Sequence, residues 1–405
     1  MPTTEQDVAA GPRPGTDGAV SLEARTLLLT AAGSEVDDEL RALLSGRIDG
    51  QLLLRLALRE RAVVALDSRM SGLGIDPGDG EFRDLLRRHA MISAFRQQYL
   101  HARLREAVWV LHEAGFRVML LKGAALGTTV YPSFGDRPMG DADLLLHAAE
   151  ARPAFELLRA RGWCLEQPPE QEAFYEGHHH LPPLCDPVQR SAVLEIHTNL
   201  FQEWHPFRIP LDEVWEGAAR TNIGSTPVSV PGPHHALLHV CTHFAWSHQA
   251  RKGSWRAFRD LHALLDHGAV DWASLCREAR QARAATCCYW TLRLAARLGR
   301  LPVPDHVWPE LRPPGSEALR HRVEAHLTVN LFPGDNACPS VRVGKRVWEM
   351  AIRPRWSGHG AVRPWDEPFR VGGEGSAPEG VARALRSHVR RLGAWRRYAS
   401  AVLTD

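Results

Sequence analysis

Two aspartates separated by one residue form the clearest chemical feature of this 405-residue sequence. Asp141 and Asp143 begin a short run that continues into Leu144–Leu146 and predicts a buried strand. Side chains two apart on a strand point to the same face, so the two carboxylates lie together. Like charges this close need a cation between them, and carboxylate oxygens suit Mg²⁺. Taken alone, such a pair also fits a strand edge with solvated carboxylates.

A third carboxylate stands on another predicted strand, Ala192–Thr198. Leu194 and Ile196 face one side of this strand, whereas Glu195 and His197 face the other. A charged residue inside an apolar run needs a partner. A metal ion shared with the two aspartates would supply that partner, so Glu195 joins them as a predicted ligand.

A lysine and a glycine follow the predicted strand Val118–Leu121 and open a short helix. Gly123 lets the backbone approach a phosphate, and a helix N-terminus favours an anion. Only three of the 49 basic residues are lysines, so Lys122 is an informative choice at this place. Lys122 therefore predicts a phosphate contact; the alternative is a lysine at a strand end that extends its ammonium into water.

Two other charged residues leave alternatives open. Arg137 either binds phosphate or pairs with its neighbour Asp136, and the sequence supports both roles equally. Asp260, in a predicted helix, is expected to cap it or to pair with Arg256 or Arg259.

Histidines cluster in two places. His178–His180 lie between the second and third predicted strands, where they either reach the carboxylates or form a solvated loop. His235, His239 and His243 share one face of a predicted helix, but the glutamate of the zinc motif H-E-x-x-H is absent. Local packing is therefore the expected role of the second group.

The elements that position these residues alternate between strand and helix in the middle of the chain and are helical on both sides. The central order is strand Val118–Leu121, a helix from Lys122, strand Asp141–His147, helix Ala148–Arg161 and strand Ala192–Thr198. Helical patterns occupy Gln51–Met70, Asp84–Gly115, His234–His248, Ser254–His267, Trp272–Leu298, Glu317–Leu331 and Pro378–Leu403. We therefore expect a disordered tail at 1–20, a helical region at 21–115, an α/β core at 116–232 and a helical domain at 233–405, with an irregular segment at Pro354–Ala377.

Composition narrows the class of protein. The net charge is +2 and no convincing basic patch is present, so nucleic acid is not the expected partner. No run approaches the roughly 20 apolar residues that span a bilayer, and the first 20 residues lack the pattern of a signal peptide. Seven scattered cysteines indicate neither a disulfide framework nor a zinc ribbon. A cytoplasmic protein fits these features best.

The motifs together resemble the uncharacterised nucleotidyltransferase family, which has the polymerase-beta-like nucleotidyltransferase fold. The resemblance extends over roughly residues 45 to 305, and its most specific parts are Leu120–Leu126, Tyr131–Pro132, Arg137–Leu145 and Leu194–His197. It implies an α+β fold in which a small sheet core is flanked by helical regions. It also implies that Asp141, Asp143 and Glu195 hold two Mg²⁺ ions. Lys122-Gly123-Ala124 replaces the Gly-Ser or Gly-Gly pair of the wider superfamily.

The predicted activity is transfer of a nucleoside monophosphate from an NTP to a hydroxyl, phosphate or amine. Asp141, Asp143 and Glu195 would be catalytic, and Glu195 would help to activate the acceptor. Lys122, Gly123 and Arg137 would bind the nucleotide. The acceptor is a small molecule, a glycan or a peptide, and neither it nor the oligomeric state can be read from the sequence. The alternatives are a non-catalytic nucleotide sensor on the same fold and a metal-dependent phosphohydrolase.

Overall fold

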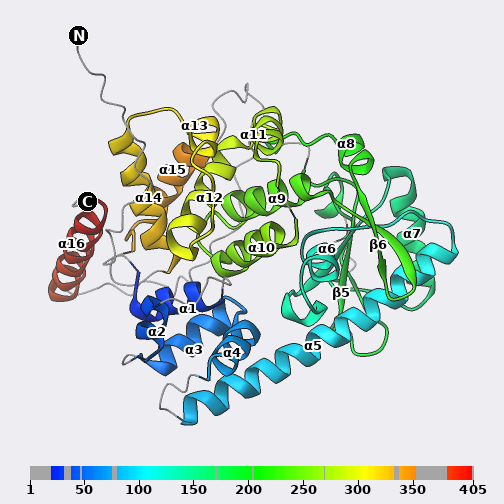
Figure 1. The fold of residues 1–405 in the computed structure, drawn as a ribbon, viewed down its shortest axis with the longest axis horizontal. Helices are drawn as coiled ribbons and strands as arrows, with labels where there is room; N and C mark the ends of the chain where they lie inside the picture. Colours follow the sequence, from blue (N-terminus) through cyan, green and yellow to red (C-terminus); the bar gives the residue numbers. More distant parts are fainter. Residues whose placement is uncertain are drawn as a thin grey trace.

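A computed structural model describes residues 20–31, 38–45, 48–74, 80–168, 172, 174–202, 205–268, 270–332, 337–352 and 381–403. The predicted tail, apart from its last residue, and the predicted irregular segment Pro354–Ala377 lie outside these ranges. The fold is α+β: one seven-stranded mixed sheet lies at one end of the molecule, and helices form the rest (Figure 1).

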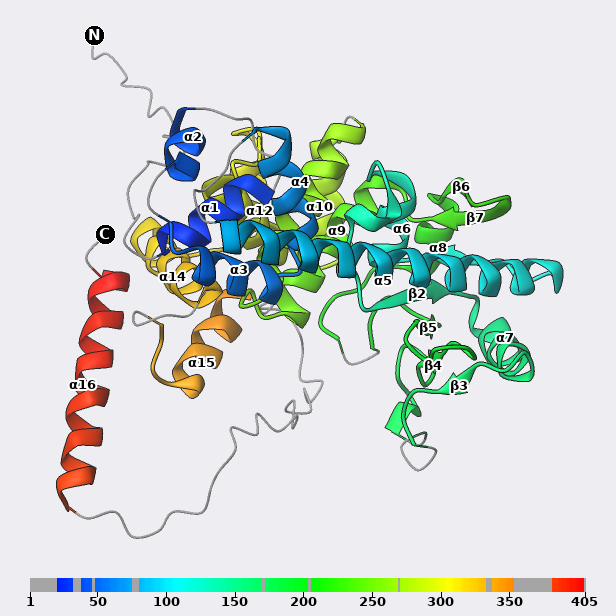
Figure 2. The same ribbon diagram turned by 90° about the horizontal axis from the view of Figure 1, so that it is seen from below.

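The N-terminal helices form a small bundle that a long helix joins to the sheet. They are α1 (Leu22–Ala31), α2 (Asp38–Ser45), α3 (Gly50–Arg59), α4 (Val63–Gly72) and the long α5 (Gly80–Glu113). Figures 1 and 2 show α5 running from this bundle to the sheet. The predicted helical stretch Gln51–Met70 is divided in two, and Arg61 at the break has a φ of +56°. The carboxylate of Glu60 faces the later helix α10 (Ser254–His267), where it accepts a hydrogen bond from the Trp255 N–H at 3.4 Å.

The sheet has the strand order β3-β4-β5-β2-β1-β7-β6. Three of its strands fall where the sequence predicts them: β1 (Met119–Leu120), β2 (Asp141–Leu145) and β5 (Val193–His197). The other four were not predicted: β3 (Cys164–Leu165), β4 (Leu184–Cys185), β6 (Ala219–Ile223) and β7 (Thr226–Val230). Strand β2 runs parallel to β5 and antiparallel to β1, with Asp143 directly opposite Glu195. The first and third predicted strands are therefore both neighbours of the second.

The two faces of the central strands have different partners. Ala142, Leu144, Leu194 and Ile196 belong to one buried apolar cluster with residues of α5 and of α7 (Ala148–Ala160). Because side chains alternate along a strand, the carboxylates of β2 and β5 lie on the opposite face. That face is turned toward the helices that follow the sheet.

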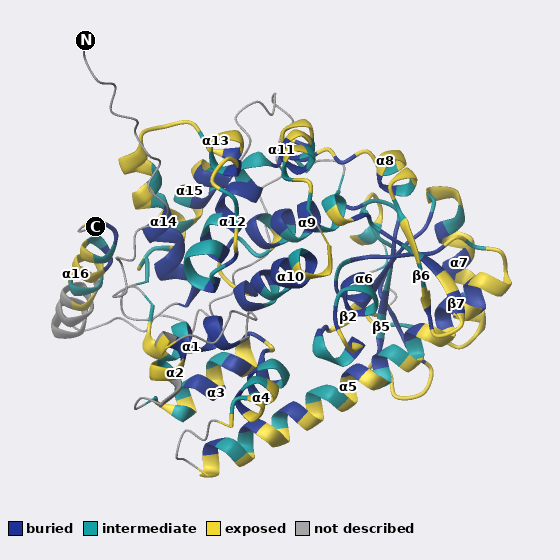
Figure 3. Cartoon of the chain, in the orientation of Figure 1, coloured by how far each residue is buried: buried dark blue, intermediate teal, exposed yellow. Residues whose placement is uncertain are grey.

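The helices after the sheet pack around a second buried cluster. They are α9 (Pro233–Thr242), the π-helical turn η4 (His243–Ser247), α10 (Ser254–His267), α11 (Trp272–Gln281), α12 (Ala285–Gly299), α13 (Val307–Leu311), α14 (Glu317–Leu331) and α15 (Val341–Ile352); α8 (Leu211–Glu216) precedes them beside the sheet. The last helix, α16 (Val381–Leu403), packs against α14 through a separate small cluster of Val329, Tyr398 and Val402. The predicted helix Trp272–Leu298 is two helices, with Arg283 at a φ of +60° between them. Buried positions concentrate in α9, α10 and α12 (Figure 3). Among the described residues, no helix combines the length and apolar character needed to cross a membrane.

Candidate active site

A buried carboxylate, Asp143, lies at the centre of the site. Only 3% of this residue is exposed, and its register with Glu195 comes from the parallel pairing of β2 and β5. Its Oδ1 accepts a hydrogen bond from Lys122 Nζ at 2.5 Å and lies 2.8 Å from His197 Nε2. His197 Nε2 is also 3.3 Å from Glu195 Oε2. One ligand atom from each of Asp143, Glu195 and His197 lies within 4.8 Å of the other two, so this group could hold a metal ion.

Asp141 is placed on the same face of β2 but at its exposed end. Desolvation, followed by the negative charges of Asp143 and Glu195, raises its pKa to about 6. Asp143 and Glu195 therefore place negative charge close to the end of β2, and the cations Lys122 and Arg61 act on Asp141 in the opposite direction.

The charges in the interior of the site determine what it can bind. Burial opposes ionisation of Asp143, but the Lys122 ammonium and the His197 hydrogen bond outweigh it and hold the pKa of Asp143 well below its usual value. Burial also opposes the charge on Lys122, and the Asp143 carboxylate outweighs it and raises the lysine pKa. The Lys122 ammonium contacts Asp143 directly, and His197 lies between Asp143 and Glu195. Burial and the Lys122 charge oppose protonation of His197, but its hydrogen bonds to these two carboxylates outweigh them and raise its pKa. The hard oxygen donors of three neighbouring carboxylates fit a divalent ion such as Mg²⁺.

The turn that carries Lys122 has an unusual backbone. Lys122 is the first residue of α6 (Lys122–Thr129) and has a φ of +46°, a region that side chains other than glycine rarely adopt. Strain of this kind tends to be kept where function requires it. A methyl group added at Gly123 would lie 3.1 Å from Arg137 Nη1 and 3.2 Å from Met139 Sδ. Gly123 therefore leaves room for Arg137 and Met139, which belong to the segment that leads into β2.

Arg137 has a partner that the sequence did not suggest. Its Nε and Nη2 donate to the two carboxylate oxygens of Asp260 at 2.8 and 2.7 Å, and Tyr131 donates its hydroxyl to the same carboxylate at 2.7 Å. Asp136 instead accepts a hydrogen bond from the Ser133 N–H at 3.0 Å. The alternative in which Arg137 pairs with Asp136 is therefore wrong, and the direct ion-pair partner of Asp260 is Arg137 instead of Arg256 or Arg259. The Arg137–Asp260 pair connects the segment before β2 to helix α10.

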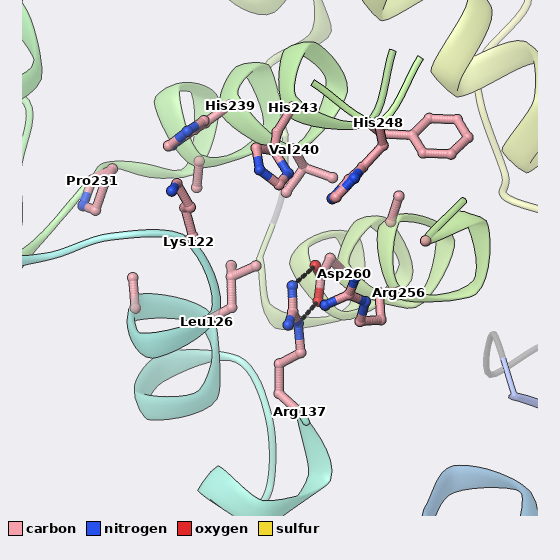
Figure 4. Close-up of a pocket in the computed structure, with 15 residues that line it drawn as sticks. Lys122, Leu126, Arg137, Pro231, His239, Val240, His243, His248, Arg256 and Asp260 are labelled. Atoms are coloured by element: carbon pink, nitrogen blue, oxygen red, sulfur yellow. Dashed lines mark hydrogen bonds and ion pairs between the residues drawn. The ribbon is translucent and has the colours of Figure 1, made fainter. Parts of the chain in front are cut away.

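A pocket opens between α6 and the helices α9 and α10, with Lys122 at its rim (Figure 4). His239, His243 and His248 line one side, and Arg256 lies beside the Arg137–Asp260 pair on the other. Burial lowers the pKa of His239 to about 3 and that of His248 to about 4. These histidines are therefore neutral near pH 7. Of the predicted series, His239 and His243 face the pocket, whereas the ring of His235 lies near Gly217.

The histidine triplet lies beside the carboxylates and is not a loop in open solvent. The ring centroids of His179 and His180 are 5.1 and 5.2 Å from that of His197. Two backbone hydrogen bonds hold the segment to the strand: Leu181 N–H to Ile196 O and Thr198 N–H to His179 O, both 2.8 Å. The triplet forms a second group with three ligand atoms within 4.8 Å. His197 was not among the predicted site residues, although it shares the Glu195 face of β5.

Comparison with protein-family models identifies the family. A model of a family described as uncharacterised nucleotidyltransferase matches residues 46–300. This range contains Lys122, both aspartates, Glu195, the histidines and the Arg137–Asp260 pair. No curated protein matches the chain.

Proposed function

The chain belongs to the uncharacterised nucleotidyltransferase family, and from this premise we propose that it is a Mg²⁺-dependent enzyme that transfers a nucleoside monophosphate from an NTP to an acceptor. The observation that supports this most strongly is the register of β2 and β5. It sets Asp143 opposite Glu195, with Asp141 on the same face. Carboxylates converging from two adjacent strands are what binding of a metal–triphosphate complex requires.

The nucleotide is proposed to lie between Lys122 and the pocket of Figure 4. The N–H groups at the start of α6 and the Lys122 ammonium face the triphosphate, whose negative charge they favour. The neutral histidines and apolar side chains of the pocket accept the nucleoside. Arg137 acts as a positioning residue, because its Nε and Nη2 already donate to Asp260.

Asp141, Asp143 and Glu195 would hold the metal ions, which when bound supply charge neutralisation for the triphosphate and make the acceptor hydroxyl more acidic. Glu195 is the proposed group that takes the acceptor proton, and His197 orients it through the 3.3 Å contact. The acceptor oxygen then forms a bond to the α-phosphorus. The bond from that phosphorus to the bridging oxygen breaks, and pyrophosphate leaves.

We also propose that the division at 21–115, 116–232 and 233–405 is functional. The middle unit carries the carboxylates and Lys122, and the last unit supplies α9 and α10, the opposite wall of the pocket. The Arg137–Asp260 pair holds these two units at a fixed distance.

The test is release of pyrophosphate from each of the four NTPs, with Mg²⁺ and a panel of hydroxyl, phosphate and amine acceptors. Asp141→Asn combined with Asp143→Asn should reduce the rate by about a thousandfold or more. Asp212→Asn, an exposed aspartate on α8, is the matched control and should leave it unchanged. Full activity in the double variant would refute the assignment. Release of phosphate or nucleoside monophosphate without a modified product would support a phosphohydrolase instead.

A further inference from the structure

A groove is lined by residues from the middle of α5 and by Gly140, the residue before Asp141. The side chains that define it are Arg61, Met91, Ile92, Phe95, Arg96 and Met139. The groove has none of its lining residues in common with the pocket of Figure 4. The site therefore has one hollow at Lys122 and another at the beginning of β2.

Apolar side chains are exposed along this groove. Met91 and Phe95 are each 66% exposed and Ile92 is 50% exposed. Met91 and Phe95 are four residues apart on α5, so they lie next to each other on one helix face. Large apolar side chains gathered in one place on a surface mark a site that another molecule covers.

The groove adjoins the carboxylate site at Gly140. A methyl group added at Gly140 would lie 2.9 Å from Arg61 Nη1, so the guanidinium rests directly on the turn into β2. Gln97 fixes this turn: its Nε2 donates to the Met139 carbonyl at 2.9 Å, and its Oε1 accepts from the Met139 N–H at 3.1 Å. A molecule in the groove would therefore meet a rigid floor next to Asp141.

The opposite wall, which includes Gln189 and Ser191, is equally fixed. Asp186 accepts backbone hydrogen bonds of 2.8 to 2.9 Å from Val188, Gln189, Ser191 and Ala192, and a 2.6 Å bond from the Tyr99 hydroxyl. Tyr99 continues the line of Met91 and Phe95 on α5. Internal hydrogen bonds thus hold both the Gly140 turn and the segment of Gln189 and Ser191 in place.

The charge of the groove restricts its occupant. Its basic lining residues are Arg61, Arg96 and His89, and no carboxylate is among the lining residues in the described part of the chain. Residues 89–100 of α5 extend over roughly 16 Å at the rise of an α-helix, the length of about five extended residues. The occupant is therefore an elongated molecule that combines negative charge with apolar groups.

Building on the function proposed above, we propose that the acceptor is an acidic polypeptide segment with apolar side chains, which lies along α5 and places a serine, threonine or tyrosine hydroxyl at Asp141. Its oxygen bonds to the α-phosphorus, its proton passes to Glu195, and pyrophosphate leaves, so the product is a phosphodiester on the peptide. Exposed methionine, isoleucine and phenylalanine favour a polypeptide over RNA. An RNA backbone presents charged phosphates and hydroxylated riboses, which cover apolar side chains poorly, and bases stack on aromatic rings, which Met91 and Ile92 lack.

The first test selects binders from a random peptide library displayed on phage, with the full chain as bait and no nucleotide. Enriched peptides should combine acidic and apolar residues, and Phe95→Glu should weaken their binding at least roughly tenfold, the effect of placing a charge against an apolar and acidic ligand. Met350→Glu changes a methionine that is 72% exposed on α15 and should leave binding unchanged. No enrichment, or enriched peptides that bind the Phe95→Glu variant equally well, would overturn the proposal.

The second test identifies the occupant directly. A photo-crosslinking amino acid at position 95 should attach a selected peptide, as read by mass spectrometry. Attachment to another part of the same chain or to a second copy, with the peptide in excess, would overturn the proposal. So would displacement of the peptide by random-sequence RNA that is itself attached. Mg²⁺-dependent NTP binding is measured on the same samples; its absence while the peptide still binds at position 95 would reject the proposed function but not the groove.

Discussion

Two buried aspartates, Asp143 and Asp260, show how differently this molecule uses a carboxylate held beside a cation. Asp260 has both oxygens bound to one guanidinium and one of them also to the Tyr131 hydroxyl. Asp143 contacts Lys122 and His197 through a single oxygen, and two further carboxylates lie close to it. The balanced pair of Arg137 and Asp260, in which each charge has its opposite, holds two structural elements at a fixed distance. The unbalanced cluster around Asp143, in which several carboxylates crowd together, is instead suited to bind a cation. This difference separates positioning residues from candidate catalytic ones.

The largest expected effect is on activity. Glu195→Gln removes the proposed proton acceptor but keeps the shape of the side chain, so turnover should fall by roughly 10² to 10⁴. Stability in urea should change by less than about 1 kcal/mol, because the residue is half-buried at the rim of the cluster. Glu216→Gln, at an exposed position of α8, is the control for both measurements. Unchanged turnover in the Glu195 variant would remove Glu195 from the mechanism.

Variants of the balanced Arg137–Asp260 pair should change the stability of the protein. Asp260→Ala leaves the Arg137 guanidinium buried without its carboxylate, which costs about 3 to 5 kcal/mol of unfolding free energy. Asp266→Ala, an exposed position on the same helix, should cost less than about 0.5 kcal/mol. Replacing both partners, Arg137→Met with Asp260→Leu, should recover most of the loss. A single variant as stable as the wild type would show that the pair does not hold α10 in place.

Lys122→Met tests whether Mg²⁺ can take the place of the Lys122 ammonium beside Asp143. Removing the ammonium frees Asp143 Oδ1, so Mg²⁺ alone should bind roughly tenfold more tightly. The NTP complex should bind roughly tenfold more weakly, because a phosphate contact is lost. Lys252→Met, an exposed lysine, serves as the control. Changes of the same sign in both affinities would contradict the proposed role of Lys122.

The smallest effect concerns pH. Burial lowers the pKa of His239 to about 3, so the folded protein keeps this ring neutral while the unfolded chain takes up a proton near pH 6.5. Stability is therefore lost as pH falls from 6.5 toward 3, by at most about 1.4 kcal/mol per pH unit for this one group. His239→Leu should make the urea midpoint less dependent on pH over this range, whereas His112→Leu at an exposed position should not. An unchanged pH slope in the His239 variant would contradict this assignment.

Local patterns were sufficient for the parts of the fold that carry the site. A short apolar run predicted β2, apolar residues in alternation with Glu195 predicted β5, and the lysine and glycine after the first strand predicted the start of α6. Helices α10 and α14 begin and end where the sequence places them. The register that sets Asp143 opposite Glu195 depends on how two distant strands pair, so it could not be read from either strand alone.

Two features that the sequence did not predict depend on contacts between residues far apart in the chain. The helical stretch around Glu60 is broken where its carboxylate bonds to Trp255, 195 residues away, and no local signal records that contact. The Arg137–Asp260 pair joins residues 123 apart for the same reason. The hairpin of β6 and β7 did have a signal: Thr226, Val228 and Val230 alternate after Gly224, which has a φ of +63°. Pro227 within the second strand obscured it.

Binding of NTP with and without Mg²⁺, measured by isothermal titration calorimetry, tests the carboxylate site most directly because it needs no acceptor. The wild-type protein should bind an NTP tightly only when Mg²⁺ is present. Asp141→Asn with Asp143→Asn should lose that dependence and retain at most the weak contact through Lys122. Equal affinity for NTP with and without Mg²⁺ in the wild type, or undiminished Mg²⁺-dependent binding in the double variant, would contradict the proposed metal–nucleotide site.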